Sequence, residues 1–194
     1  IEAYAEEVSS DPLVPELNSK VTVKKVKDDV YGAQLITLSN GIRVHVLKTD
    51  YSPNNISMQA VSWGGSSLYP NSEYNLADNA SLVQIGGWGQ FSAIDLQKKL
   101  SGKQASVSPS ISDRTEALHG ACVKKDLETM LQLTYLCFTS PRKDDEAYNS
   151  MLERVRNSLK NADMNPATAL SDSVASVVYN NNVRAVRLRA EDVD

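Results

Sequence analysis

The feature that most constrains this fold is an asparagine-glycine pair set between two runs of β-branched and apolar residues. The runs read QLITL and IRVHVL, and Ser39, Asn40 and Gly41 separate them. Asn-Gly between such runs is the strongest short-range signal for a β-hairpin, because a tight turn needs residues that tolerate positive φ. If Asn40 and Gly41 are the central turn residues, Leu35 lies opposite Val46 and Thr37 lies opposite Val44.

The same alternation predicts three further strands, with helices between them. Ile56–Trp63 alternates and ends at Gly64-Gly65, and a second hairpin is predicted for Ala105–Ile111 and Thr115–Val123. Between them the sequence predicts a helix over Ser72–Ile85 that ends at Gly86-Gly87. A short helix, AIDLQKKL, follows, with Ser92 as its cap and Gly102 after its end.

Three longer helices are predicted in the last third of the chain. Asp126 is expected to cap a helix through Phe138 that is apolar on nearly all sides and so should be largely buried. A helix with acidic residues in its first turn follows Pro141. Asn165-Pro166 starts the last helix, whose apolar stripe comprises Leu170, Val174, Val177 and Val178.

This order of elements predicts an α+β fold. We expect an antiparallel sheet of about five to six strands with helices packed mainly on one face. Residues 1–30, with an acidic start and Pro12 and Pro15, indicate an N-terminal linker, and residues 31–194 a single domain. Because the chain begins at Ile1 rather than Met and stops in a charged run, we expect a piece of a longer protein, truncated at its C-terminus.

Composition narrows the classes of partner. The 194 residues carry a formal net charge of -4, which argues against nucleic-acid or anionic-membrane surfaces, and no apolar run is long enough to span a membrane. Cys122 and Cys137 are too few for a disulfide framework and match no metal motif, so we expect buried structural cysteines.

Several motifs taken together resemble the pitrilysin/insulinase family of zinc metallopeptidases. They are the hairpin LSNGIRVHVLKT, the strand end AVSWGGSS, the turn GGWG followed by SAIDLQKKLSG, and the helix DLETMLQLTYLCFTSP. The resemblance runs from about Val21 to the C-terminus. It implies two homologous halves, each of two α+β domains, that close around an unfolded peptide, with zinc in the first half. A segment without zinc ligands resembles the opening domain of the second half.

The helix that would carry the zinc ligands in that family lacks them. An inverzincin binds zinc through H-x-x-E-H, and those positions fall near Ala77, Ala80 and Ser81. None of these side chains can bind zinc or activate its water, and Asp78 alone is no site. Glu153 falls near the family's distant glutamate ligand, but a solvated glutamate paired with Asn157 or an arginine is the favoured interpretation. We therefore expect no catalytic residue and no metal in this segment, with zinc elsewhere in the parent protein.

Other residues with chemical potential lack the neighbours that a site needs. His45 and His119 have no second ligand at i+2 or i+4 and are interpreted as ordinary hydrogen-bonded histidines. Gly86–Gly89 is interpreted as a helix stop, since it lacks the lysine-hydroxyl pair of a phosphate loop. Arg184, Arg187 and Arg189 form a basic cluster that could bind an acidic partner, although a chain terminus stripped of its neighbours is the simpler interpretation.

Three functional hypotheses remain from the sequence. The first is a non-catalytic domain that walls the peptidase chamber and binds an extended peptide by strand addition. The second is an inactive homologue that serves as an assembly or partner-binding subunit. The third is an autonomous hydrolase, which predicts peptide cleavage with tightly bound zinc. Expected partners are other domains of the polypeptide, an extended peptide, and a second copy paired through an exposed sheet edge. The compartment is undetermined, and a periplasmic or secreted parent follows only by analogy.

Overall fold

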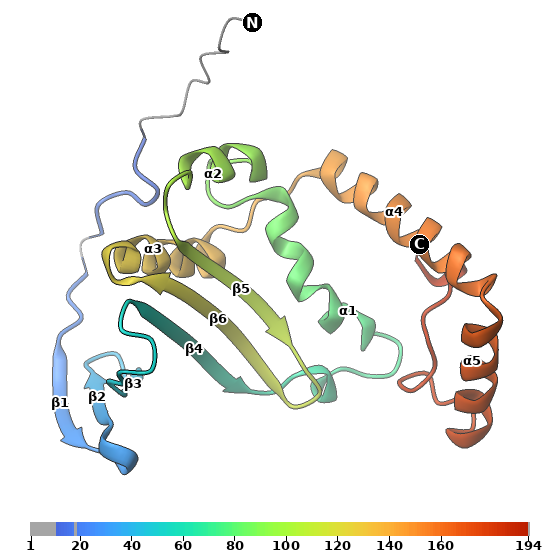
Figure 1. The fold of residues 1–194 in the computed structure, drawn as a ribbon, viewed down its shortest axis with the longest axis horizontal. Helices are drawn as coiled ribbons and strands as arrows, with labels where there is room; N and C mark the ends of the chain where they lie inside the picture. Colours follow the sequence, from blue (N-terminus) through green and yellow to red (C-terminus); the bar gives the residue numbers. More distant parts are fainter. Residues whose placement is uncertain (1–10, 18, 194) are drawn as a thin grey trace, which may run out of the picture.

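The α+β class is confirmed, but the strands form two separate sheets rather than one (Figure 1). The structure is a computed structural model that describes residues 11–17 and 19–193. The first sheet has the order β1-β2-β3, with β1 at Val23–Asp28, β2 at Gln34–Leu38 and β3 at Arg43–Val46. The second has the order β4-β6-β5, with β4 at Asn55–Trp63, β5 at Ala105–Ile111 and β6 at Thr115–Val123. All pairs are antiparallel.

The division into two sheets corrects the prediction of a single five- to six-stranded sheet. β3 is only four residues long and exposed throughout, whereas β4 pairs with β6 along all nine of its residues. Because β6 lies in the core, β4 gains more from pairing there than beside β3. β1 lies within the segment predicted to be a linker, and the acidic opening stretch lies outside the described residues. The predicted domain boundary at residue 30 stays a prediction.

The predicted hairpin is present, but its register is shifted by one residue. Leu35 pairs with His45 and Thr37 with Arg43, in place of Val46 and Val44. Of the two turn residues, only Gly41 has positive φ, at 90°, so the tight turn that needs positive φ at both residues does not form. Leu38 N–H instead bonds to the Ile42 carbonyl at 2.9 Å across a three-residue loop. A shift of one residue exchanges the faces on which the side chains lie.

The helix predicted over Ser72–Ile85 is mostly a 3-10 helix. The α-helical part, α1, covers only Asn75–Asp78, and the 3-10 helix η3 continues over Asn79–Gly86. Tyr74, the residue before α1, makes no side-chain capping hydrogen bond, so no cap stabilises the α-helical geometry at this end. The remaining 3-10 turns are η1 (Val30–Gly32), η2 (Ser66–Leu68), η4 (Lys124–Asp126) and η5 (Ala190–Asp192).

The other helices lie where they were predicted. They are α2 (Ala93–Lys99), α3 (Leu127–Thr139), α4 (Asp145–Asp163) and α5 (Pro166–Val178). Of these, α2 and α5 begin at the predicted caps Ser92 and Asn165. Ser92 Oγ accepts from Asp95 N–H at 3.1 Å, and Asp144 and Asn165 accept from Ala147 N–H and Ala167 N–H at 3.0 and 2.9 Å. Each cap satisfies an amide that the helix leaves unpaired.

Asp126 does not cap α3 as predicted. Its side chain is 2% exposed and accepts instead from Gln104 N–H, at 2.9 Å, while Lys103 Nζ lies 3.6 Å from its other oxygen. The Gln104 N–H, followed by the nearby lysines, lowers the pKa of the Asp126 carboxyl. This carboxylate therefore joins the start of β5 to the start of α3.

The core lies between the second sheet and α3. Val107, Leu118 and Cys122 of the sheet meet Met130, Leu133 and Leu136 of α3, together with Trp88 and Val14. The prediction that α3 is largely buried is wrong: its outer face leaves Leu131 and Phe138 exposed, because the sheet covers only one side. The stripe on α5 is also exposed, and in Figure 1 α4 and α5 extend away from both sheets.

Candidate functional site

The positions that the family resemblance assigns to zinc ligands, Ala77, Ala80 and Ser81, lie on α1 and η3, and none of them carries a side chain that binds zinc. Ala77 is 1% exposed and faces the interior, while Ser81 is exposed on η3. Ala80 lines an apolar cavity of about 420 Å³ between η3, the end of α3 and the ends of the second sheet's strands. Methyl and hydroxyl groups cannot supply the imidazole and carboxylate donors that zinc requires. The residues present therefore do not fit the metal.

Glu153, which the family resemblance places near a distant glutamate ligand, forms an ion pair on the surface. It lies on α4, which packs against η3, and its carboxylate pairs with the Arg156 guanidinium one turn later. Its side chain is 63% exposed. Within the described part of the chain, no group of three or more His, Cys, Asp or Glu side chains could hold a metal ion. The structure thus gives Glu153 a charge partner and no companion ligands.

The two histidines lie on separate sheets. His45 on β3 contacts Asp29 through Nδ1 at 2.5 Å. The hydrogen bond from the Val30 N–H, followed by this contact with His45, lowers the pKa of the Asp29 carboxyl. His119 lies exposed on the face of β6 opposite α3.

Burial raises the pKa of both the Cys122 and the Cys137 thiols, which disfavours the reactive thiolate.

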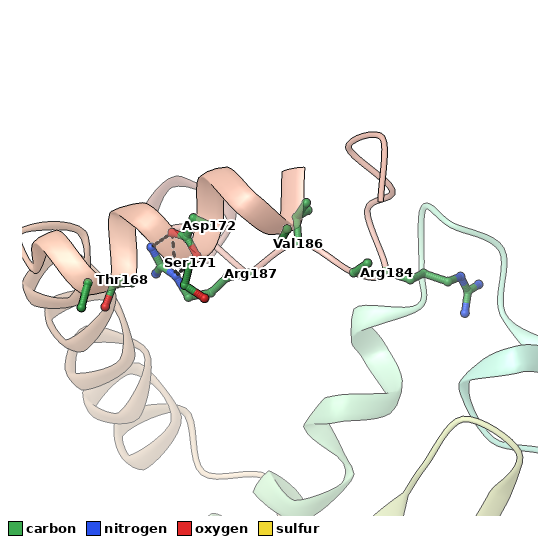
Figure 2. A pocket seen from close by; sticks show the side chains of 9 residues that line it. Thr168, Ser171, Asp172, Arg184, Val186 and Arg187 are labelled. Atoms are coloured by element: carbon green, nitrogen blue, oxygen red, sulfur yellow. Dashed lines mark hydrogen bonds and ion pairs between the residues drawn. The ribbon is translucent and has the colours of Figure 1, made fainter. Parts of the chain in front are cut away.

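The basic cluster predicted near the end of the chain is used within the molecule. Figure 2 shows Arg187 hydrogen-bonded to Asp172 in the lining of a cavity of about 560 Å³, while the guanidinium of Arg184, at the other end of the lining, extends away from this pair. Arg187 also pairs with Asp163, and Arg189 bonds to the same carboxylate at 3.1 Å. These contacts fasten residues 183–189, the C-terminal segment, to the corner between α4 and α5. An acidic partner is therefore not needed to balance these charges.

Arg184 fastens the other end of the C-terminal segment to the loop before α1. Its guanidinium donates to Asn71 Oδ1 at 2.7 Å and to the carbonyl oxygens of Ser66 and Tyr69 at 3.0 and 2.5 Å. The same group lies 5.3 Å from the centre of the Tyr74 ring. Sequence patterns gave no signal for these contacts, since more than a hundred residues separate the partners.

The C-terminal segment is expected to detach in acid before the core unfolds. Hydrogen bonds and charge from Arg187 hold the pKa of Asp163 and Asp172 below the ordinary value of 3.8. A carboxyl whose pKa is lower in the folded state stabilises that state above its unfolded pKa, and the stabilisation is lost as pH falls through the folded pKa. We therefore expect the amide NMR signals of Val186 and Leu188 to move to unfolded positions as pH falls below about 4.

The matched control for this acid step is the double variant Asp163→Asn, Asp172→Asn. It removes the titrating groups, so the C-terminal segment should lose its pH-dependent step in this range. If both proteins kept these signals unchanged down to global unfolding, the ion pairs would not be what holds the segment.

Relatives of the chain are zinc proteases, although no family model matches it. The chain is 29% identical over 139 residues to a probable zinc protease PqqL of Haemophilus influenzae, which covers 71% of this chain and 15% of that protein. It is 26% identical over 167 residues to a zinc protease PQQL-like protein of Arabidopsis thaliana, covering 83% of this chain and 15% of the relative. The resemblance to pitrilysin-type zinc proteases is confirmed. The chain thus spans about 15% of the length of these relatives.

Solved structures of similar proteases have the same fold. The periplasmic protease PqqL of Escherichia coli matches all of this chain with a TM-score of 0.80 and 21% identity, using 21% of its own length. The ferredoxin protease FusC, solved as a mutant in complex with Arabidopsis ferredoxin, matches 97% with a TM-score of 0.76 and 18% identity, again over 21% of its length. The arrangement of strands and helices described above is therefore found in part of each larger protease.

Proposed function

We propose that this chain is a non-catalytic domain of a larger zinc peptidase, in which it lines the chamber that holds the peptide substrate. The proposal is supported by the helix α1–η3, which the family resemblance equates with the zinc-binding helix and which presents Ala77, Ala80 and Ser81. A catalytic zinc site needs three protein ligands and an open position, and the donor set here supplies none. Zinc would then be held elsewhere in the parent protein.

Exposed apolar faces support the proposal that other domains of the same polypeptide cover this one. Leu131 and Phe138 project from the outer face of α3, and α5 exposes Leu170, Val174 and Val177 on one face. Apolar side chains gathered on one helix face mark an interaction surface more often than an isolated exposed residue does. Within the described residues, the side chains on both faces remain largely exposed.

The outer edge of β4 is the better candidate for binding an extended peptide. Proline in a paired strand is tolerated where its missing N–H faces away from the partner, so Pro109 places the odd-numbered amides of β5 on its outer edge. The outer edge of β5 therefore lacks one backbone N–H donor, at Pro109. Following the registers across β6, the even-numbered amides of β4 face β6 and its odd-numbered ones face outward. Ser57, Gln59, Val61 and Trp63 then offer an uninterrupted row of donors.

A protein ligand is also consistent with the similar proteases. FusC was solved with ferredoxin, a whole protein, and we propose an extended protein segment as the ligand of this domain as well. The E. coli relative is periplasmic, which supports a periplasmic parent by analogy.

The decisive test has two parts. Elemental analysis of the protein after exposure to zinc and gel filtration should find no stoichiometric metal, and a quenched peptide library should remain uncleaved. Tightly bound zinc together with cleavage would overturn the proposal. An H-x-x-E-H sequence upstream in the same reading frame would favour the chamber domain over the alternative, an inactive assembly subunit.

Restoring the motif residues is not expected to restore the site. In the variant Ala77→His, Ala80→Glu, Ser81→His, two histidines four residues apart share a face only on an α-helix. Here α1 ends at Asp78, and η3 continues with about three residues per turn, which places residue 81 on another face. Competition with a zinc chelator should therefore show no tight site. The single variant Ser81→His is the control, and equal zinc affinity in both proteins is expected.

A further inference from the structure

The cavity of about 420 Å³ that Ala80 lines contains a single charged side chain. Its walls are mainly apolar and come from η3 (Val83), from the end of α3 (Phe138) and from the strands of the second sheet (Leu118). Among the described residues that line it, Glu116 on β6 is the one Asp, Glu, Lys or Arg. The cavity therefore combines a large apolar surface with one negative charge.

Glu116 is half-buried and has no counter-charge. It lies on the same face of β6 as Leu118, and its cross-strand neighbours are Ser62 on β4 and Ile111 on β5. A Cβ at Gly64 would lie 2.9 Å from its Oε1, so the glycine leaves room for the carboxylate. No side chain that the structure describes forms an ion pair or a hydrogen bond with this carboxylate. A carboxylate against apolar walls without a partner costs stability, and a bound cation would offset that cost.

The cavity is open on the side of β4. The 3-10 helix η3 packs against β5, and Figure 1 shows the α1–η3 helix beside β5, with β4 on the opposite edge of the sheet. On that opposite side, Ala60 and Ser62 of β4 line the cavity and are exposed. In a strand added along β4, alternate side chains would point to the same face as Ala60 and Ser62. The opening therefore lies beside the edge proposed for an extended peptide.

The lining selects the chemistry of an occupant. A long aliphatic amine is apolar along its stem and charged at its end, which matches apolar walls and one carboxylate. An acidic group would be repelled, and a neutral apolar group would leave Glu116 unpaired. An ammonium brings three N–H donors where a guanidinium brings five, so it leaves fewer donors unpaired beside a single carboxylate. The ring of Phe138, which is 70% exposed, can also attract a cation to its face.

We propose that this cavity binds a lysine side chain of an extended peptide, with the lysine ammonium paired to the Glu116 carboxylate. The proposal rests on the proposed function for the choice of a peptide as ligand. It adds a sequence preference, because the outward amides of β4 contact only the backbone of a peptide, whereas this cavity distinguishes one side chain from another.

The protein contains two phenylalanines, so fluorine NMR after labelling with 4-fluorophenylalanine gives a direct test. Phe91 is 3% exposed, lies outside the cavity lining and serves as the internal reference. Titration with acetyl-Ala-Lys-Ala-amide should shift the Phe138 signal and saturate, while the Phe91 signal stays in place. The same peptide with norleucine keeps the four-carbon stem without the ammonium, and it should bind about tenfold more weakly or worse. A Phe138 signal that does not move, or equal affinity for both peptides, would overturn the proposal.

Paired glutamate variants locate the effect. Glu116→Gln removes the charge and keeps the shape, so the lysine peptide should bind it no more tightly than the norleucine peptide does. Glu128→Gln makes the same change in the first turn of α3, whereas the cavity lies at the other end of that helix, and it should leave both affinities within about twofold. Should Glu116→Gln fail to fold, Ala80→Leu narrows the cavity from η3 and should weaken the binding of both peptides. Unchanged affinity for the lysine peptide in the cavity variant that folds would contradict the assignment.

The two proposals fail in distinguishable ways. If a longer peptide binds along β4 but lysine and norleucine are bound equally, the cavity assignment is wrong and the chamber role stands. If Phe138 responds to the lysine peptide as expected but the protein proves to hold zinc and cleave peptides, the cavity assignment stands and the non-catalytic role is wrong.

Discussion

Gly87→Ala is expected to lower the free energy of unfolding by more than about 4 kcal/mol, the range reached by few single substitutions. Gly87 has φ of 83°, a conformation that L side chains rarely adopt. A Cβ there would also lie 2.2 Å from the Phe91 carbonyl oxygen and 2.6 Å from Ala93 N. Both contacts are with backbone atoms, which cannot move aside as a flexible side chain can. Urea denaturation followed by circular dichroism measures the loss.

Gly102→Ala separates the two contributions. Gly102 has a similar φ of 77°, but nothing lies within 4 Å of the position that its Cβ would take. This variant should lose only the cost of the left-handed backbone, about 1–2 kcal/mol. Equal losses in the two proteins would mean that the turn moves freely enough to admit a side chain, and the steric argument would fail.

The turn at Gly86–Gly89 matters because it places Trp88. Gly89 N–H bonds to the Ser140 carbonyl at 2.8 Å, and Arg142 Nη1 donates to the Gly86 carbonyl at 2.9 Å. The turn is thereby held against the segment between α3 and α4, more than fifty residues later in the chain. A position fixed from both sides keeps the Trp88 indole in the core.

Local signals predicted the elements of this fold better than their arrangement. The second hairpin and the helices α2, α4 and α5 were predicted because their signals act within a few residues. These signals are alternation for the hairpin, the caps Ser92 and Asn165 for α2 and α5, and an acidic first turn for α4. The division into two sheets was missed because strand pairing depends on which partner lies nearby after folding. The register of the first hairpin was missed because Asn-Gly fits both a tight turn and a looser three-residue loop.

In the candidate site as well, features set by neighbouring residues could be predicted from the sequence, and contacts between distant residues could not. The absence of zinc ligands on α1–η3 can be read directly from Ala77, Ala80 and Ser81. The fastening of the C-terminal segment could not be predicted, because Arg187 meets Asp163 and Asp172 only after α4 and α5 have packed. The unpaired carboxylate of Glu116 is likewise a property of packing, since the walls around it come from α3, η3 and three strands.

Gln59→Pro and Ala60→Pro are expected to separate strand addition from stability on β4. The Gln59 amide faces outward by the register argument, so its loss should leave pairing with β6 intact and cost roughly 1 kcal/mol or less. The Ala60 amide faces Leu118 on β6, and its loss should cost about 2–3 kcal/mol because a ladder bond is broken and an acceptor is left unpaired.

Self-association should not follow stability: Gln59→Pro, which costs little stability, is the substitution that should abolish it. An open edge of nine residues with no proline or charged side chain is a template for a further strand, so we expect the unmodified protein to form dimers at high concentration. Light scattering should find Gln59→Pro monomeric at the same concentration, although it is nearly as stable. If the unmodified protein were strictly monomeric at that concentration, the outer edge of β4 would not mediate self-association. Dimers that persist in Gln59→Pro would place the contact elsewhere, for example on the exposed faces of α3 or α5, and would remove the main support for peptide binding at β4.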